Sequence, residues 1–366
     1  MPIPSGKTGI ANLPLHGGKA PAWLFQRMTK LAREITIAVV VEYGPETMLR
    51  RLSEPFWFQA LGCVLGFDWH SSGVTTTVCG ALKEGTRELQ SELGLFIAGG
   101  KGRASRKTPT EIEQAGLRLN TGTESLVYAS RMAAKVDNTA LQDGYQLYHH
   151  VFFFTKNGSW AIVQQGMNET TKYARRYHWL SEITDDFVCE PHAAICTEKT
   201  GQVLNLVARE SATARETIPA IIRQDKPEKL VEKIKQLQIL DLPSRHHIEL
   251  QDIHPDRLYK TFINTYEKQP DNFEKLLGLE GVGPKTMRAL ALLAELVYDV
   301  PVSIRDPARY SFAHGGKDGH PFPVDKKTYD KSIEILHLAL EQASIGDTEK
   351  IAAFRRLKNW NVQIVL

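Results

Sequence analysis

Cysteine is scarce in this sequence. The four cysteines, Cys63, Cys79, Cys189 and Cys196, include no Cys-x-x-Cys pair, so the spacing typical of metal clusters and redox motifs is missing. We therefore predict no bound metal and no cofactor. We also predict that the cysteines are buried thiols in a reducing compartment, as expected of a cytoplasmic protein.

Long apolar runs and a strong net charge are missing as well. No run approaches the length of a membrane-spanning helix, and the first residues lack a signal-peptide core, so we expect no contact with a membrane. The formal net charge is only +3, which restricts any nucleic-acid surface to a local patch. The Walker pattern is absent, which argues against a nucleotide triphosphate site. No internal repeat is visible, and no pattern predicts an oligomeric state.

The composition is that of a globular protein with room for more than one domain. The chain has 366 residues, of which 42% are hydrophobic and 24% are charged, and this balance argues against long disordered segments. Apolar periodicity is mixed before about residue 215 and helical after it. We predict an α+β fold, with a mixed α/β domain over residues 1–215 and an all-helical domain over residues 216–366.

The first hundred residues alternate between helical and strand-like patterns. A β-prone run with Val39, Val40 and Val41 favours a strand, and a nearly continuous apolar run around Trp57 and Leu61 favours a buried helix. The resulting expectations are helices at 23–34, 46–52, 56–67 and 81–89, and strands at 35–42 and 93–98.

Residues 148–165 carry the clearest β signal. Two apolar runs flank Asn157-Gly158, a dipeptide that favours a tight β-hairpin. Because side chains alternate along a strand, His149 and His150 are predicted to face opposite sides. We therefore expect at most one of these histidines to point into any given site.

Two basic segments are candidate nucleic-acid contacts. One follows the strand at 93–98 on a glycine-rich loop, and its basic residues are Lys101, Arg103, Arg106 and Lys107. The other interleaves cations with aromatic rings, in Lys172, Arg175, Arg176, Tyr177, His178 and Trp179. Cations suit phosphates, and rings suit stacked bases. The alternatives are a solvated basic loop and a helix that packs its aromatic face into the core.

A glycine-rich turn between two helical patterns is the most informative segment. Gly281-Val282-Gly283 allows positive φ and leaves main-chain N–H groups bare. Pro284 suits the first position of the helix that follows. The free N–H groups at a helix N-terminus form a natural phosphate site, to which Lys285 adds a charge and Thr286 a hydroxyl. An ordinary helical hairpin closed by glycines is the alternative.

This turn and its flanking helices resemble a helix-hairpin-helix, the motif that grips a DNA backbone without reading bases. The order Leu-x-Gly-Val-Gly-x-Lys-Thr, followed by Val-Asp at a helix start, is similar to that of the helix-hairpin-helix DNA glycosylases. That resemblance implies that Lys285 attacks the sugar of a damaged nucleotide. It also implies that Asp325 supports the cationic charge that develops there. The attack would expel the base and leave a Schiff base, from which the strand can be cut.

Over its whole length the chain is similar to an uncharacterised family of archaeal and bacterial proteins of unknown function. The stretches that carry this resemblance are 13–19, 68–73, 164–168, 174–179 and 314–325. Polar and aromatic residues on apparent loops indicate a pocket. Its expected members are Asp68, His70, Gln164, Gln165, Asn168, His314 and His320.

The sequence thus predicts a DNA repair enzyme, a glycosylase with or without lyase activity, that holds DNA through its phosphate backbone. One alternative is a metal-dependent nuclease in which the hairpin only positions DNA and Mg²⁺ or Mn²⁺ performs the cleavage. Its candidate ligands are Asp68, His70, Asp137, Asp143, His149, Glu190 and His192. A non-catalytic DNA-binding protein is the other alternative.

Overall fold

The protein is a mixed α+β structure, as the sequence predicted. The computed structural model describes residues 22–66, 73–197, 199–237, 253–310, 326–344, 346, 349–351 and 353–357. The α-helices in these residues are α1 (Ala22–Tyr43), α2 (Pro45–Ser53), α3 (Pro55–Leu65), α4 (Gly73–Thr86), α5 (Gln90–Leu93), α6 (Thr108–Ala115), α7 (Glu124–Lys135), α8 (Ala212–Gln224), α9 (Pro227–Leu237), α10 (Pro255–Lys268), α11 (Phe273–Gly278), α12 (Pro284–Tyr298) and α13 (Lys326–Gln342). The strands are β1 (Leu95–Lys101), β2 (Leu141–Gln142), β3 (Gln146–Thr155), β4 (Trp160–Met167), β5 (Ala174–Leu180), β6 (Ala194–Cys196), β7 (Gln202–Asn205) and β8 (Ser303–Arg305).

The N-terminal segment is helical throughout, so the strand predicted at 35–42 is wrong. Residues 22–43 form the single helix α1. Its buried residues include Met28, Leu31, Ile35 and Val39, which recur at the three- and four-residue spacing of one helix face. Tertiary packing of this face outweighs the weak strand preference of the valines. The helices predicted at 46–52 and 56–67 are confirmed as α2 and α3.

The central sheet has five strands in the order β1-β3-β4-β5-β6, and all its pairs are antiparallel. The hairpin predicted around Asn157-Gly158 is confirmed, because β3 and β4 pair from Phe154 and Trp160 outward. Gly158 has φ of 90°, a value that favours glycine in a tight turn. The next strand is β5, where the sequence had suggested either a nucleic-acid surface or a helix face.

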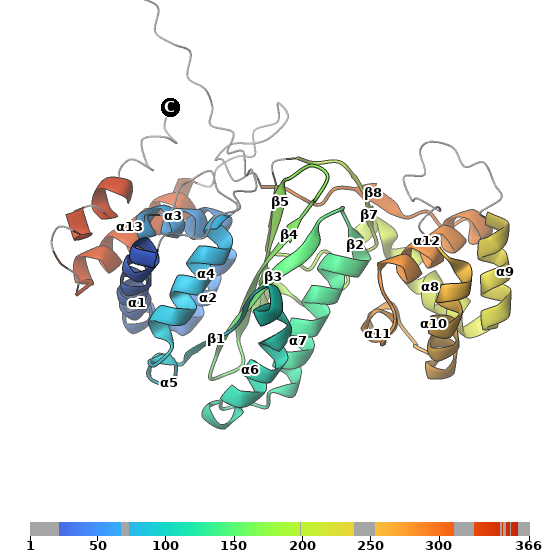
Figure 1. Cartoon of the computed structure of the whole chain (residues 1–366), viewed down its shortest axis with the longest axis horizontal. Coiled ribbons are helices and arrows are strands. Elements are labelled where there is room, and N and C mark those ends of the chain that lie inside the picture. Colours follow the sequence, from blue (N-terminus) through green and yellow to red (C-terminus); the bar gives the residue numbers. More distant parts are fainter. Residues whose placement is uncertain are drawn as a thin grey trace, which may run out of the picture.

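Alternating side chains send the two faces of this sheet into two different cores. Phe96, Phe152 and Phe154 belong to one core cluster, together with α6, α7 and the helices α8 to α12. Ile97 and Phe153, one position along, belong to the other, with α1 to α4 and α13. Figure 1 shows the sheet between these two groups of helices. The sheet is therefore covered on both faces and is the centre of the molecule.

The packing does not follow the expected division at residue 215. The core cluster on the α7 side runs from β1 through α8 to α12 without interruption. Strand β8 pairs with β7, whose other neighbour is β2. Helix α13 packs against α1 and α3, on the opposite face of the sheet from α8 to α12. The C-terminal part of the chain is thus shared between both faces.

None of the described helices is both long enough and apolar enough to cross a membrane.

Candidate functional site

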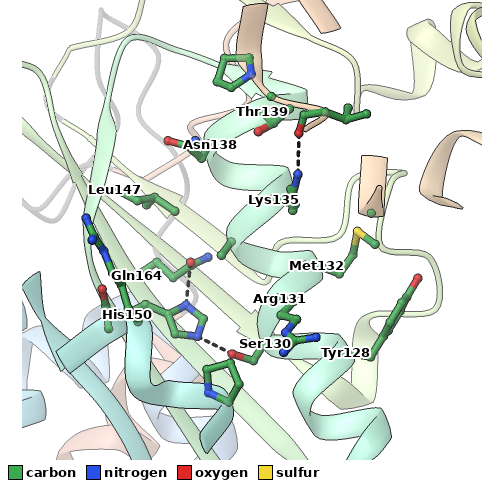
Figure 2. Close-up of a pocket in the computed structure, with 18 of the residues that line it drawn as sticks. Tyr128, Ser130, Arg131, Met132, Lys135, Asn138, Thr139, Leu147, His150 and Gln164 are labelled. Atoms are coloured by element: carbon green, nitrogen blue, oxygen red, sulfur yellow. Dashed lines mark hydrogen bonds between the residues drawn. The ribbon is translucent and has the colours of Figure 1, made fainter. Parts of the chain in front are cut away.

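A cavity of about 610 Å³ lies where four parts of the chain meet. Its lining comes from the 3₁₀-helix η1 (Gly102–Lys107), from α7, from β3 and β4, and from the turn between α11 and α12. Figure 2 shows side chains of α7 along one wall, with His150 and Gln164 of the sheet beside them. A cavity of this size falls within the usual range for small-ligand sites.

The turn at residues 279–283 forms part of the cavity wall. Gly281 is exposed and has φ of 85°, while Gly283 caps α12 and Pro284 occupies its first turn. Val282 is buried and anchors the turn to the core. The N–H of Val282 donates to the carbonyl of Leu279 at 3.3 Å. Gly283, at the N-cap of α12, lies beside the cavity and at the positive end of the helix dipole, where an anion is favoured.

Two further residues of the predicted phosphate site differ in their exposure. Lys285 is exposed and does not line the cavity, a position suited to a phosphate outside it. Thr286 is only 2% exposed, so the expectation that its hydroxyl contacts a phosphate is corrected. Its side chain lies on the face of α12 that packs into the core.

Lys135 connects the turn to α7. Its Nζ donates hydrogen bonds to the carbonyl oxygens of Val282 at 2.5 Å and Leu279 at 3.4 Å. The side chain lines the cavity, and burial lowers the pKa of its amine. Lys135 therefore holds the turn in place and also presents a partly desolvated amine to the cavity (Figure 2).

One wall of the cavity continues into a buried chain of polar side chains. His150 Nε2 lies 2.9 Å from Ser130 Oγ, and His150 Nδ1 lies 2.8 Å from Gln164 Oε1. Gln164 Nε2 donates to Asp137 Oδ2 at 2.5 Å, and the indole N–H of Trp179 donates to the same oxygen at 2.9 Å. His192 Nε2 contacts the other oxygen of this carboxylate. Such a buried network fixes the orientation of each member.

The second histidine of β3 behaves differently. His149 is 1% exposed, and neither of its ring nitrogens has a hydrogen-bond partner in the described structure. Burial, with smaller contributions from His150 and Lys101, lowers the pKa of His149 to about 3. Both histidines are among the residues around the cavity, but along β3 His150 alternates with Phe152 and Phe154 of one core cluster, whereas His149 alternates with Val151 and Phe153 of the other. The register of β3 against β4 shifts between Leu147 and His149, and this irregularity interrupts regular alternation next to the site.

The charge around the cavity is of one sign. Its lining includes the cations Arg106, Arg131 and Lys135 and no aspartate or glutamate. Neither arginine forms an ion pair with any residue that the structure describes. Arg106 comes from the basic glycine-rich loop that the sequence had singled out, so the fold brings that loop to the same cavity as the glycine turn. Lys101, Arg103 and Lys107 of this loop are exposed but do not line the cavity.

Strand β5 corrects the second candidate contact surface. Five of its residues are at most 1% exposed, namely Arg175, Arg176, Tyr177, His178 and Trp179. Arg175 donates to Asp143 at 2.8 Å and to Asp306 at 2.6 Å, and Arg176 lies over the ring of Phe58 at 4.6 Å. Arg175 thus neutralises two buried carboxylates, and both cations lie inside the protein and offer no surface to a nucleic acid. Lys172, in the turn before the strand, is exposed.

The expected pocket members are only partly brought together. Gln164 lines the cavity, whereas Gln165 points to Tyr148 and is absent from the lining. Asn168 accepts the N–H groups of Thr170 and Thr171, so it organises a turn. The remaining candidates lie outside the described residues, and these are Asp68, His70, His314, His320 and the proposed catalytic Asp325.

Two candidate ligands of the metal-dependent alternative are engaged by other side chains. Asp143 is bonded by Arg175 and Tyr177, and Asp137 by Gln164, Trp179 and His192. Within the described ranges, no group of three or more His, Cys, Asp or Glu side chains is arranged to hold a metal ion.

The sequence interpretation overlooked α7, which supplies most of one cavity wall. Tyr128, Arg131, Lys135 and Asn138 recur at three- and four-residue spacing and all line the cavity. The sequence shows this polar stripe beside the apolar positions of α7, and such a pattern indicates an amphipathic helix with one exposed face. It could have identified α7 as a candidate part of the site. After Lys135 the backbone widens into the π-helical turn η3 (Val136–Ala140), which carries Asp137. Such π-turns are often found at functional sites.

Comparison with known proteins gives a family and no activity. No curated protein and no solved structure matches the chain significantly. A family model described as "Protein of unknown function (DUF763)" matches residues 9–324. This range includes every described residue of the cavity. The chain therefore belongs to this family of uncharacterised proteins.

Proposed function

We propose that this protein is a DNA repair enzyme that holds a DNA backbone at its glycine turn and removes a damaged base. The observation that carries the proposal is the union of this turn and the cavity. Val282 and the helix-capping Gly283 border a space of about 610 Å³ whose lining includes cations and no carboxylate.

The turn supplies the backbone contact. Main-chain N–H groups beside a helix N-terminus attract a phosphate through hydrogen bonds and through the helix dipole. Lys285 is exposed beside these groups and adds a positive charge. Arg106 and Arg131 extend the positive charge along the cavity. This grip is independent of base sequence, because it uses only the phosphodiester.

The cavity supplies room for a nucleotide that has left the stack. An enzyme that acts on a base must extrude it from the duplex and receive it in a shaped pocket. Tyr128 and Met132 provide flat and apolar contacts along α7, and Asn138 and Thr139 provide polar ones. The proposed substrate is thus a damaged nucleotide in a DNA strand, and the proposed setting is the cytoplasm.

The proposed reaction is the attack of a lysine amine on C1′ of the damaged nucleotide, which expels the base. Lys285 is the amine that the resemblance to DNA glycosylases assigns, with Asp325 as the supporting carboxylate. Lys135 is a second amine at this site, and burial lowers its pKa and so favours its nucleophilic neutral form. The test below separates the two lysines.

The backbone contact is tested by the salt dependence of DNA binding. Lys285→Ala should weaken binding to an unmodified duplex and lower the slope of log K against log salt by about 1, because one phosphate contact is lost. Lys275→Ala is the matched control, since Lys275 lies on neighbouring α11, is exposed and pairs with Asp271 at 2.7 Å. Fluorescence anisotropy at several salt concentrations measures both. Equal slopes in the two variants would contradict the contact.

The chemistry is tested with labelled duplexes that carry uracil, hypoxanthine, oxidised guanine or an abasic site. The protein should release a base from at least one duplex in the presence of EDTA, and borohydride should trap a covalent adduct. Tryptic mapping of the adduct then identifies the lysine. An adduct on Lys285 supports the assignment, and one on Lys135 moves the nucleophile into the cavity. Base release that is lost in EDTA would favour the metal-dependent alternative, and intact bases in every duplex would leave only DNA binding.

A further inference from the structure

We propose that Ser130 and His150 form a nucleophile and general base that hydrolyse phosphodiesters in the cavity, with Gln164 and Asp137 as positioning residues. The pair lines the cavity, and Figure 2 shows His150 between Ser130 and Gln164. This activity goes beyond base removal, and it needs neither a lysine nucleophile nor the binding of DNA.

The hydrogen bonds leave one arrangement of protons. The indole N–H of Trp179 can only donate, so Asp137 Oδ2 accepts it. Gln164 presents its NH₂ group to the same oxygen and to the carbonyl of Ala133. Its Oε1 therefore faces His150 at 2.8 Å and accepts a proton from Nδ1.

With the proton on Nδ1, His150 Nε2 carries a lone pair. Ser130 Oγ lies 2.9 Å away and must donate its hydrogen to this lone pair. Burial lowers the pKa of His150 and so favours the neutral imidazole. A hydroxyl that donates to a neutral imidazole, with the imidazole held by a third group, is the arrangement of an activated nucleophile.

The steps balance without a metal or a redox partner. Ser130 Oγ forms a bond to phosphorus while its proton passes to His150 Nε2. The bond from phosphorus to the leaving oxygen breaks, and that oxygen takes the proton from His150 and departs as an alcohol. Water then attacks the phosphoserine, gives a proton to His150, and Ser130 regains its hydroxyl. The products are an alcohol and a phosphate monoester.

The charge of the cavity selects the substrate class. Arg131 follows Ser130 on α7, Arg106 and Lys135 also line the cavity, and no carboxylate does. These cations would stabilise the negative oxygens of a phosphoryl group as charge develops on them. A phosphodiester is anionic both when it binds and in the transition state, whereas an acyl ester is neutral when it binds, so these cations favour a phosphodiester as the substrate.

Two probes test the pair in the full chain without DNA. A biotinylated fluorophosphonate should label wild-type protein, with the adduct located on Ser130 by peptide mass spectrometry. Bis(4-nitrophenyl) phosphate should be hydrolysed in EDTA with release of 4-nitrophenolate, and its rate enhancement over the uncatalysed reaction should exceed that of 4-nitrophenyl acetate. Ser130→Ala should abolish the label and lower hydrolysis by about 100-fold or more.

Ser105→Ala is the matched control. Ser105 also lines the cavity, but its hydroxyl donates to the carbonyl of Gly102 at 2.6 Å and has no histidine partner. This variant should keep the label and the hydrolysis. Unlabelled Ser130, equal losses in the two variants, or a larger rate enhancement on the acetate ester than on the phosphodiester would each overturn the proposal.

The positioning residues need a readout other than activity. In protein with ¹⁵N-labelled histidine, His150 should show a protonated Nδ1 and an unprotonated, hydrogen-bonded Nε2. Gln164→Leu should change this tautomer pattern, whereas Ser130→Ala should shift the Nε2 signal alone. A His150 that carries its proton on Nε2 in the wild type would contradict the assigned hydrogen-bond direction. Each outcome can be read whether or not the chain removes bases from DNA.

Discussion

At the scale of one residue, the burial of His149 lowers the stability of the folded protein. It is a buried imidazole beside the cavity, and both its ring nitrogens lack partners in the described structure. A buried polar group without a hydrogen bond costs on the order of 1–3 kcal/mol. Proteins often tolerate such a cost where a ligand supplies the missing partner.

His149 should make stability depend on pH. Its pKa is about 3 in the folded protein and about 6.5 when unfolded. Because the unfolded chain takes up the proton first, stability is present above pH 6.5 and falls as pH drops towards 3. The contribution between pH 7 and pH 5 is about 2 kcal/mol. In urea unfolding, the free energy of unfolding of His149→Leu should fall by about 2 kcal/mol less than that of wild type between pH 7 and pH 5. The same loss as in wild type would contradict the folded-state pKa.

At the scale of one element, the turn between α11 and α12 depends on a single glycine. Gly281 has φ of 85°, and a Cβ at this position would meet Thr261 Oγ1 at 3.3 Å. Gly283 has φ of −131°, and its added Cβ would meet nothing within 4 Å. Only the first glycine is therefore required by the backbone, although the sequence pattern treats both alike.

These two glycines make a matched pair of variants. Gly281→Ala should lower the free energy of unfolding by about 1–2 kcal/mol, because a left-handed conformation strains a residue with a Cβ. Gly283→Ala adopts its conformation freely and should change stability by less than about 0.5 kcal/mol. Chemical denaturation of both variants measures the difference. Equal losses would show that the turn does not have the backbone described here.

At the scale of the whole molecule, a helix near the C-terminal end of the chain packs against helices near its N-terminal end. Helix α13 returns from the C-terminal half to pack on α1 and α3. Its residues Leu336 and Leu340 are fully buried in the core cluster on that face of the sheet. The α1 side of the sheet is therefore incomplete without a helix from the far end of the chain.

Replacing one of these leucines should destabilise the core cluster on the α1 side of the sheet more than the other core cluster. Leu336→Ala should lower the free energy of unfolding by about 2–5 kcal/mol, as truncations of buried leucines do. Hydrogen exchange should increase most in α1 and α13 and least in α9 and α10, which belong to the other core cluster. Glu334→Ala, an exposed change on the same helix, should leave exchange unchanged. A uniform increase throughout the chain would contradict the separation of the two cores.

Local patterns in the sequence determined the elements that local chemistry controls. The β3–β4 hairpin follows from Asn157-Gly158 between two apolar runs, and the start of α12 follows from a proline after a glycine. Both need only neighbouring residues to be recognised. The same local reasoning predicted a strand around Val39, where the structure has helix α1. Packing of one whole helix face outweighs the strand preference of single residues.

The tertiary structure alone decided which residues share the site. Arg106, Ser130, His150 and Gly283 come from distant parts of the chain, and no spacing predicts that they line one cavity. It also decided that the basic and aromatic run in β5 is interior, because Asp143 and Asp306 lie opposite Arg175. The sequence does not show whether the partner of an arginine is a phosphate or a buried carboxylate. The partner is decided by long-range packing, which brings distant residues together.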